Sequence, residues 1–189
     1  MKLSLPIVLL STTLGASSLT LPSLFSSRTT QITMTSQILS DLLPLTKRIS
    51  IFASLTRDVD SVSSRLSSSG DNTTLLAPSN GAMSALPRKP WEDPEDYRAE
   101  GAQAYAGEDG QQRASGNLAR FVAAHVVPSS PWKEGQKVRT LAGTEVWWEK
   151  DEGGERRVMP GRVEVEEIGS KAGNGEVWVL KAALNYASS

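Results

Sequence analysis

The sequence predicts an α+β domain in which helices occupy the first half of the chain and strands the second. Two observations predict this class. Between residues 52 and 66 the apolar residues recur at alternating steps of three and four, as they do along one face of a helix, and further helical segments lie on either side. From residue 137 onward the chain consists of short runs rich in Val and Trp, separated by glycine. Because helices and strands are segregated rather than alternating, a doubly wound parallel sheet is disfavoured.

Length and composition limit what the domain can be. The chain has 189 residues, enough for one ordinary domain and a targeting segment, and 39% of them are hydrophobic. A net charge of -1 gives no basic excess for nucleic acid, and the absence of cysteine excludes disulfides and thiolate metal sites. We therefore expect a domain that is stabilised by packing and has no nucleic-acid partner. We take it to be a monomer.

The first 18 residues have the layout of a signal peptide. Lys2 precedes an apolar run from Leu3 to Leu10, and small residues follow. Cleavage after Ser18 fits the preference for small residues, and cleavage after Ser17 fits about as well. An uncleaved anchor is the alternative, but the apolar run is shorter than the ~20 residues that span a bilayer. The mature chain is therefore expected to have no transmembrane segment.

Residues 19–35 are predicted to be a disordered leader rich in Ser and Thr, and residues 36–187 to be the folded domain. The triplet Asn72-Thr73-Thr74 is an N-glycosylation sequon directly before a predicted strand. Asn72 is therefore a possible attachment site for a glycan if the chain enters the secretory pathway.

Helices are expected at five places in the first two thirds of the chain. Ser36 caps a short helix that Pro44 ends. A second helix ends near Gly70, and a third starts at Ser79 or Asn80. The apolar stripe of the second helix is Phe52, Leu55, Val59, Val62 and Leu66. Residues 88–116 are treated as an insertion with one helix between residues 95 and 105. The last helix carries Leu118, Phe121, Val122 and Val126 and ends at Pro128.

Strands are expected at Thr73–Ala77 and at five places near the end of the chain. The five are Lys137–Leu141, Glu145–Lys150, Glu155–Met159, Arg162–Ile168 and Glu176–Leu180. The segments 151–154 and Asn174-Gly175 supply glycine and asparagine for the tight turns of hairpins.

Four blocks of this sequence resemble the signature blocks of fasciclin domains, in order and in spacing. The first runs from Thr74 to Met83 and the second from Asn117 to Pro128, while Thr140–Gly143 and Asn174–Leu180 are similar to the two later blocks. The residues that carry the resemblance are Thr74, Ala77, Pro78, Ser79, Asn80, His125, Val126, Pro128, Leu141, Gly143, Asn174, Gly175 and Val179.

The resemblance implies a wedge-shaped β-sandwich of about seven strands flanked by helices. It implies a role in adhesion at cell surfaces, matrices or cell walls, and no reaction. Ala124 stands where many animal members carry a tyrosine associated with integrin recognition, so that partner is in doubt. Trp178 and Lys181 also depart from the family pattern. The insertion looks like that of small fungal relatives, some of which reside in the vacuole.

His125 is the single histidine, and it has two interpretations. It follows an apolar helix face and precedes Val126, Val127 and Pro128, which favours a buried, hydrogen-bonded structural histidine. The alternative is a hydrolase in which His125 joins a serine and a carboxylate in an exposed cleft.

Metal and nucleotide sites have little support. One histidine without cysteine cannot supply the usual zinc ligands, and no phosphate-binding glycine loop is present. Asp151, Glu152, Glu164, Glu166 and Glu167 could hold calcium through oxygen, but they match no calcium-binding loop, and a solvated strand face is the better interpretation. We expect no cofactor.

The tryptophans are candidates for partner contacts. Trp147 and Trp148 are adjacent on a strand, so their side chains lie on opposite faces and one of them belongs to the core. We take Trp91 and Trp148 as possible partner-binding residues, with ordinary cross-strand packing as the alternative.

The sequence therefore predicts a non-catalytic, secretory-pathway module for adhesion that binds a cell-surface or matrix protein or a glycan. The expected location is outside the cell, at its surface or in its wall. A vacuolar fasciclin-domain protein of unknown role and a hydrolase that uses His125 are the alternatives.

Overall fold

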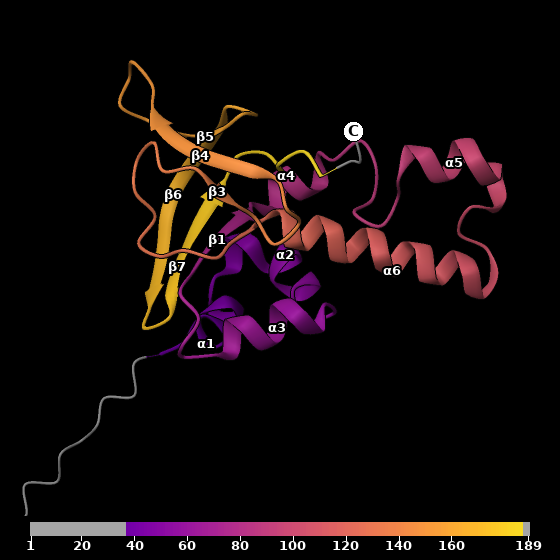
Figure 1. Cartoon of the computed structure of the whole chain (residues 1–189), viewed down its shortest axis with the longest axis horizontal. Helices are drawn as coiled ribbons and strands as arrows, with labels where there is room; N and C mark the ends of the chain where they lie inside the picture. Colours follow the sequence, from indigo (N-terminus) through magenta and orange to yellow (C-terminus); the bar gives the residue numbers. More distant parts are fainter. Residues whose placement is uncertain (1–36, 187–189) are drawn as a thin grey trace, which may run out of the picture. The chain divides into compact units, whose positions relative to one another are not determined.

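The structure is a computed structural model and describes residues 37–186 (Figure 1). The predicted signal peptide, its cleavage site at Ser18, the leader and the capping residue Ser36 lie outside the described residues.

Short helices come first and strands last (Figure 1). The α-helices are α1 (Leu39–Leu42), α2 (Ser50–Leu55), α3 (Asp60–Ser67), α4 (Asn80–Ser84), α5 (Pro94–Glu100) and α6 (Gly107–Ala124). Three single turns of 3₁₀-helix are η1 (Leu43–Leu45), η2 (Lys47–Ile49) and η3 (Gly101–Gln103). The strands are β1 (Thr73–Pro78), β2 (Val126–Val127), β3 (Val138–Arg139), β4 (Glu145–Lys150), β5 (Arg156–Met159), β6 (Val163–Ala172) and β7 (Gly175–Leu180).

The seven strands follow the hydrogen-bonded order β2-β1-β7-β6-β5-β4-β3. All neighbouring pairs are antiparallel except β1 and β7, which are parallel and in register from Thr73 opposite Gly175 to Pro78 opposite Leu180. The first residues of β6 pair with β5 and the remainder with β7, across two shifts of register. Because such bulges bend a strand, β6 joins two halves of the strand array that lie over one another.

Two hydrophobic cores lie on opposite faces of β1 and β7. Leu75 and Val177 face the core made with the helices, whereas Leu76 and Trp178 face the core made with β4, β5 and the start of β6. Every residue of both strands is buried, which explains why each strand ends in a continuous apolar run, Leu75–Pro78 in β1 and Val177–Leu180 in β7, instead of an alternating pattern. The structure therefore confirms the expected α+β class, with seven strands flanked by helices.

The apolar stripe between residues 52 and 66 does not form the single helix that its spacing predicts. It is divided into α2 and α3, although Phe52, Val62 and Leu66 are buried as expected. The break follows Thr56, whose hydroxyl donates to the carbonyl of Ala53 at 2.8 Å. Val59 then has an extended backbone before α3 begins. Local hydrogen bonds of this kind compete with helix propagation, and the periodicity of apolar residues does not record them.

The boundaries of the last helix also differ from the prediction. Helix α6 begins at Gly107 instead of near Leu118, because its first half is polar and exposed and so lacks an apolar stripe. Residue 116, the predicted end of the insertion, lies inside this helix. At the other end, His125 follows the last helical residue, and Val126 is a residue of β2 that lies opposite Leu75.

Within residues 37–186, no helix is both long enough and apolar enough to cross a bilayer.

Candidate functional site

His125 is fully buried in the core that β1 and β7 make with the helices, here called the helix-side core. Its Nε2 accepts a hydrogen bond from the backbone N–H of Leu184 at 3.0 Å, so the proton is on Nδ1, which donates to the carbonyl of Phe121 at 2.8 Å. The ring packs between Phe52 and Phe121, at centroid distances of 5.3 and 4.7 Å. Burial lowers the pKa of His125 from 6.5 to about 4. The prediction of a buried, hydrogen-bonded structural histidine is confirmed.

Asn174 occupies the turn between β6 and β7 and is also fully buried. Its Oδ1 accepts from the N–H of Leu39 at 2.8 Å, and its Nδ2 donates to the carbonyls of Leu66 and Ser68 at 2.9 and 2.8 Å. The next residue, Gly175, has a φ of 151°, and a Cβ there would clash with the carbonyl oxygen of Thr73. This turn therefore ties α1, α3 and β1 together, and Gly175 is required by the close approach.

Of the two residues that the sequence offered as the start of the third helix, Ser79 is the cap and Asn80 has a different role. The hydroxyl of Ser79 caps α4 by accepting from the N–H of Ala82 at 3.2 Å. The Asn80 amide instead accepts from the N–H of Ile51 at 3.1 Å and donates to the carbonyl of Lys47 at 2.9 Å. Asn80 thus attaches α4 to the start of α2.

The remaining motif residues also act within the fold. Thr74 donates from its hydroxyl to the carbonyl of Ser129 at 2.7 Å, and the N–H of Leu141 donates to the carbonyl of Val126 at 3.0 Å. Gly143 has a φ of 87°, which glycine adopts without strain in the turn before β4. The other members are in or beside the strands: Ala77 and Pro78 in β1, Val179 in β7, and Pro128 directly after β2.

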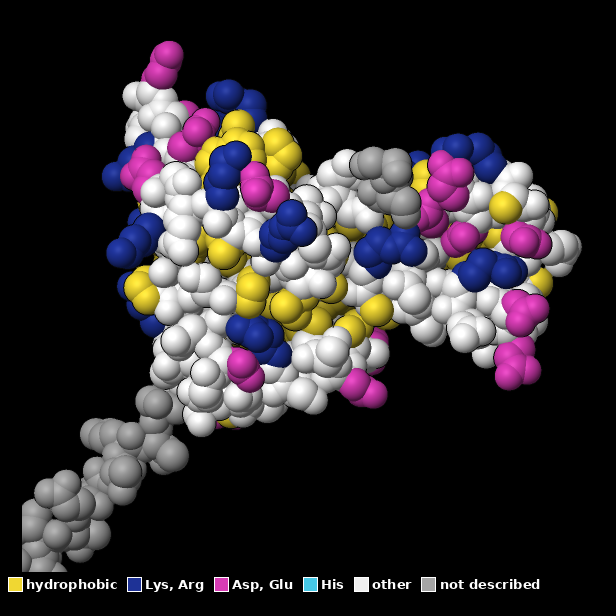
Figure 2. Space-filling model, viewed as in Figure 1, with side chains coloured by type: hydrophobic (Ala, Val, Ile, Leu, Met, Phe, Trp, Pro, Cys, Tyr) yellow, Lys and Arg dark blue, Asp and Glu magenta, His cyan; other side chains and the backbone are white. Residues whose placement is uncertain are grey.

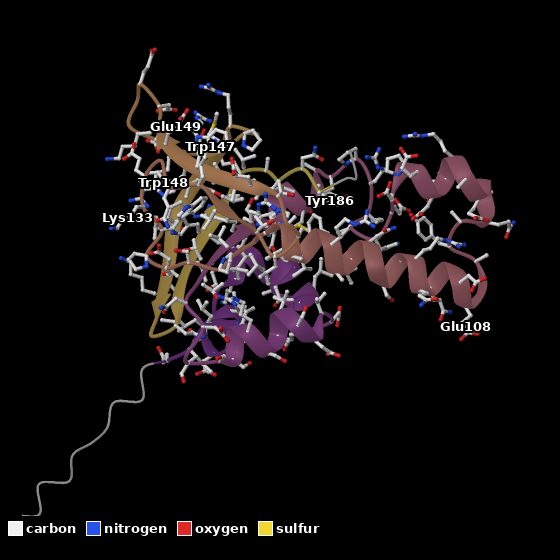
Figure 3. The ribbon with its side chains drawn as sticks, viewed as in Figure 1. Glu108, Lys133, Trp147, Trp148, Glu149 and Tyr186 are labelled. Atoms are coloured by element: carbon white, nitrogen blue, oxygen red, sulfur yellow. The ribbon has the colours of Figure 1, made fainter. Side chains whose placement is uncertain are left out.

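Trp148, one of the two tryptophans proposed for partner contact, is buried. It is only 6% exposed, and its indole N–H donates to the carbonyl of Trp132 at 3.1 Å. Trp147 is the outward member of the pair and is half-buried, with the Lys137 ammonium 4.9 Å from its ring centroid. Both tryptophans are labelled in Figure 3. The assignment of Trp148 as a contact residue was wrong. The alternation of β4 could have shown this, because Glu145 and Glu149 share the face of Trp147.

Trp91 is 39% exposed and lies at a shallow recess of about 260 Å³. The other lining residues, Ala114, Ser115 and Leu118, belong to α6. The recess carries no charged side chain and presents an aromatic ring and aliphatic groups. Trp91 therefore remains a candidate for binding a partner.

Helices α5 and α6 lie beside one another (Figure 1). A polar cluster that the sequence did not predict holds them together. The Tyr105 hydroxyl donates to Asp96 at 2.9 Å, and the buried Asn117 amide donates to the same carboxylate at 2.7 Å and to the carbonyl of Trp91 at 3.1 Å. Arg120 pairs with the buried Asp93 at 3.0 Å. These contacts fix the backbone of Trp91. The sequence did not predict them, because the polar residues involved are scattered along the chain and form no motif.

Within residues 37–186, four of the five acidic residues considered for calcium take part in ion pairs, all except Glu152. Arg157 contacts Asp151 at 2.8 Å and Glu164 at 3.1 Å, and Lys181 also contacts Glu164. Hydrogen bonds from Arg157 hold the pKa of Asp151 below its usual range. Glu166 and Glu167 pair with Arg48. In the part of the chain that the structure describes, no three histidine or acidic side chains are grouped so that they could hold a metal ion.

Charges of both signs are mixed over the visible face (Figure 2). On this face no region of a single sign forms a continuous field.

Comparisons with known proteins agree with this arrangement. The family model described as Fasciclin domain matches residues 47–185. A FAS1 domain-containing protein of Neurospora crassa is 53% identical over 151 residues, 79% of this chain and 66% of the relative. One of Aspergillus fumigatus is 47% identical over 164 residues, 86% of this chain and 70% of the relative. This chain therefore spans about two thirds of the length of these curated relatives.

A solved FAS1 domain pair from the insect cell adhesion molecule fasciclin I has a TM-score of 0.54 with this structure at 10% sequence identity. The match covers 79% of this chain and 51% of that chain, and it supports the fold alone. The family model and the fungal relatives go further, and together they show that this chain belongs to the fasciclin (FAS1) domain family.

Proposed function

We propose that this chain is a non-catalytic module of the secretory pathway that binds a cell-surface or matrix protein or a glycan as a monomer. Fasciclin domains are associated with adhesion, and the insect protein of similar fold is described as a cell adhesion molecule. The expected destination is outside the cell or in the wall, with the vacuole as the alternative.

The observation that carries the proposal is that the motif side chains hold the fold together and form no catalytic group at a cleft. His125, Asn174 and Asn80 are all held by hydrogen bonds that connect distant segments of the fold. His125 is buried, and neither ring nitrogen faces a serine or a carboxylate. A general base needs a free nitrogen at a cleft, so this geometry supports binding rather than hydrolysis.

The recess at Trp91 is the contact surface that we propose. Partly exposed aromatic side chains supply much of the free energy of binding at interfaces, because a rigid ring buries a large area at little entropic cost. The hydrogen bonds at Asn117 and Tyr105 hold the recess in place before a partner arrives, which reduces the ordering cost of binding.

Retention of the labelled domain on isolated fungal cell walls tests the contact surface. Trp91→Ala should lower the retained fraction about tenfold, as expected when roughly 1.4 kcal/mol of binding free energy is lost. Ile168→Ala is the matched control, since Ile168 is similarly exposed but lies on β6. Equal retention of all three proteins at equal melting temperature would exclude Trp91 from the contact.

Routing is tested separately by imaging a C-terminally tagged chain and mapping its N-terminus. Recovery in the wall or the medium with a new N-terminus near residue 19 supports secretion. Retention in the vacuole supports the alternative destination, and an intact Met1 in the cytosol contradicts both.

A further inference from the structure

A groove of about 380 Å³ lies between the turn of the β6–β7 hairpin and the loop that follows β2. Its volume is within the range of about 300–1,000 Å³ that small-molecule sites occupy. The lining includes Asn72, Ser130, Pro131, Lys171, Gly173 and Glu176. The groove therefore combines a cation, a carboxylate, a hydroxyl and the exposed ring of a proline.

Asn72, the first residue of the sequon, is part of this lining and is exposed. Its backbone carbonyl accepts a hydrogen bond from Nη2 of Arg65 at 3.0 Å, which fixes the main chain there. Thr74, the third residue of the sequon, is buried in β1. A group attached to the amide nitrogen of Asn72 would thus begin at the groove.

Glu176 places a largely buried carboxylate at the same groove. This residue is only 9% exposed, and its side chain lines the groove. Among residues 37–186, its carboxylate receives no side-chain hydrogen bond and no ion pair, and Lys171, its cross-strand neighbour, also has none. The Glu176 carboxylate is therefore available to accept hydrogen bonds from a group that enters the groove.

We propose that Asn72 is N-glycosylated and that the first N-acetylglucosamine lies in this groove. Its hydroxyl and acetamido N–H groups donate to Glu176, Lys171 donates to its oxygens, and the ring of Pro131 covers an apolar face of the sugar. This inference rests on the proposed secretory function, because the sugar is transferred in that pathway.

The covalent step is a substitution at C1 of the sugar. The amide nitrogen of Asn72 forms a bond to C1 of a lipid-linked diphosphate oligosaccharide and loses one proton. The bond from C1 to the phosphate oxygen breaks with its electron pair, and the lipid diphosphate leaves.

The test compares this chain made in yeast with its own leader and with a foreign signal peptide. Intact mass shows whether Asn72 carries sugar, and endoglycosidase H leaves a single N-acetylglucosamine on it. We expect this form to melt about 2–4 °C above Asn72→Gln. In a Glu176→Gln background, which keeps the shape of the side chain but removes its charge, the difference should disappear. Thr74→Ser keeps the sequon and the buried hydroxyl, so this variant should still carry the sugar and still show the difference between glycosylated and sugar-free forms.

Three outcomes are decisive. The absence of sugar in the chain with the foreign signal peptide overturns the proposal. Sugar without a difference in melting temperature overturns its placement in the groove. Sugar with the foreign signal peptide but not with the native leader supports the groove and overturns the proposed routing.

Discussion

At the scale of single residues, a few buried polar side chains connect segments that are far apart in the chain. Asn174 accepts from Leu39 across 135 positions, and His125 accepts from Leu184 across 59. Asn174 also donates to two carbonyls of a second segment, and His125 donates to the carbonyl of Phe121 in the helix that precedes it. Removing one of them leaves several buried backbone groups without partners, and the cost of those groups decides the effect of a substitution.

The protonation of His125 predicts how stability depends on pH. The pKa is about 4 in the folded protein and 6.5 when the side chain is free, so the unfolded chain binds more protons between these values. The contribution is fully present above pH 6.5 and is lost as pH falls toward 4, on the order of 3 kcal/mol in total. Urea unfolding at pH 7 and at pH 4.5 measures it.

A His125→Gln variant supplies the reference for that measurement, because it lacks the titrating ring but keeps the surface carboxylates. The free energy of unfolding of the variant should change less between the two pH values than that of the wild-type chain. Equal pH dependence in both proteins would show that His125 does not carry the effect.

Asn174→Ala should lower the free energy of unfolding by about 2–4 kcal/mol, because one N–H and two carbonyls lose their partner in a buried site. Asn174→Asp is the informative comparison, since it keeps the acceptor for Leu39 but loses both donors. Denaturant titration should place the aspartate variant below the wild-type chain as well. A change of less than about 0.5 kcal/mol in the alanine variant contradicts this role.

At the scale of elements, α5 is attached to the molecule through its contacts with α6. Gly110 permits them, because a Cβ at this position would clash with the backbone of Tyr105. Gly116 lies in the same helix but has no atom within 4 Å of a Cβ added there. The two glycines therefore differ in what they do, although both stand in a helix, where glycine is unfavourable.

Gly110→Ala should separate the start of α6 from Tyr105 and destabilise the protein by about 1–3 kcal/mol, with faster hydrogen exchange in α5. Gly116→Ala should stabilise it by about 0.5–1 kcal/mol through helix propensity. Thermal unfolding and hydrogen exchange of both variants check the pair. If both substitutions stabilise the protein, the close approach at Gly110 has no energetic importance.

The sequence predicted the elements whose side chains face a core and missed those defined by polar contacts. The strand from 145 to 150 was predicted at its observed bounds, because its Val- and Trp-rich run ends where the glycine-containing turn 151–154 begins. The break between α2 and α3 was missed because the Thr56 hydroxyl bonds to its own helix, which the spacing of apolar residues does not reveal. The early start of α6 was missed because its first turns are polar and exposed and carry no apolar stripe. Likewise, the partners of Asn80 and Asn174 are fixed by the tertiary fold and not by spacing.

At the scale of the whole molecule, the two cores share β1 and β7. The helices and His125 belong to one core, whereas Trp132, Trp148 and Trp178 belong to the other. Loss of either core exposes one face of the same central pair of strands. The two cores should therefore unfold together.

Tryptophan fluorescence and far-UV circular dichroism should accordingly give one coincident transition in urea. Phe52→Leu leaves a cavity in the helix-side core and Val158→Ala one in the other, and each should shift both signals equally, by about 1–3 kcal/mol. Two separate transitions in either variant would show that the cores are independent.

The parallel pairing of β1 with β7 also determines the order of events in time. Thr73 lies opposite Gly175, so the central strand pair cannot form until the ribosome has made almost all of the described chain. During this interval β1 has only the two residues of β2 beside it, and its apolar edge is open to mispairing with other chains. Folding that depends on such distant partners is slow. The newly made chain is therefore most vulnerable to aggregation before its last strand arrives.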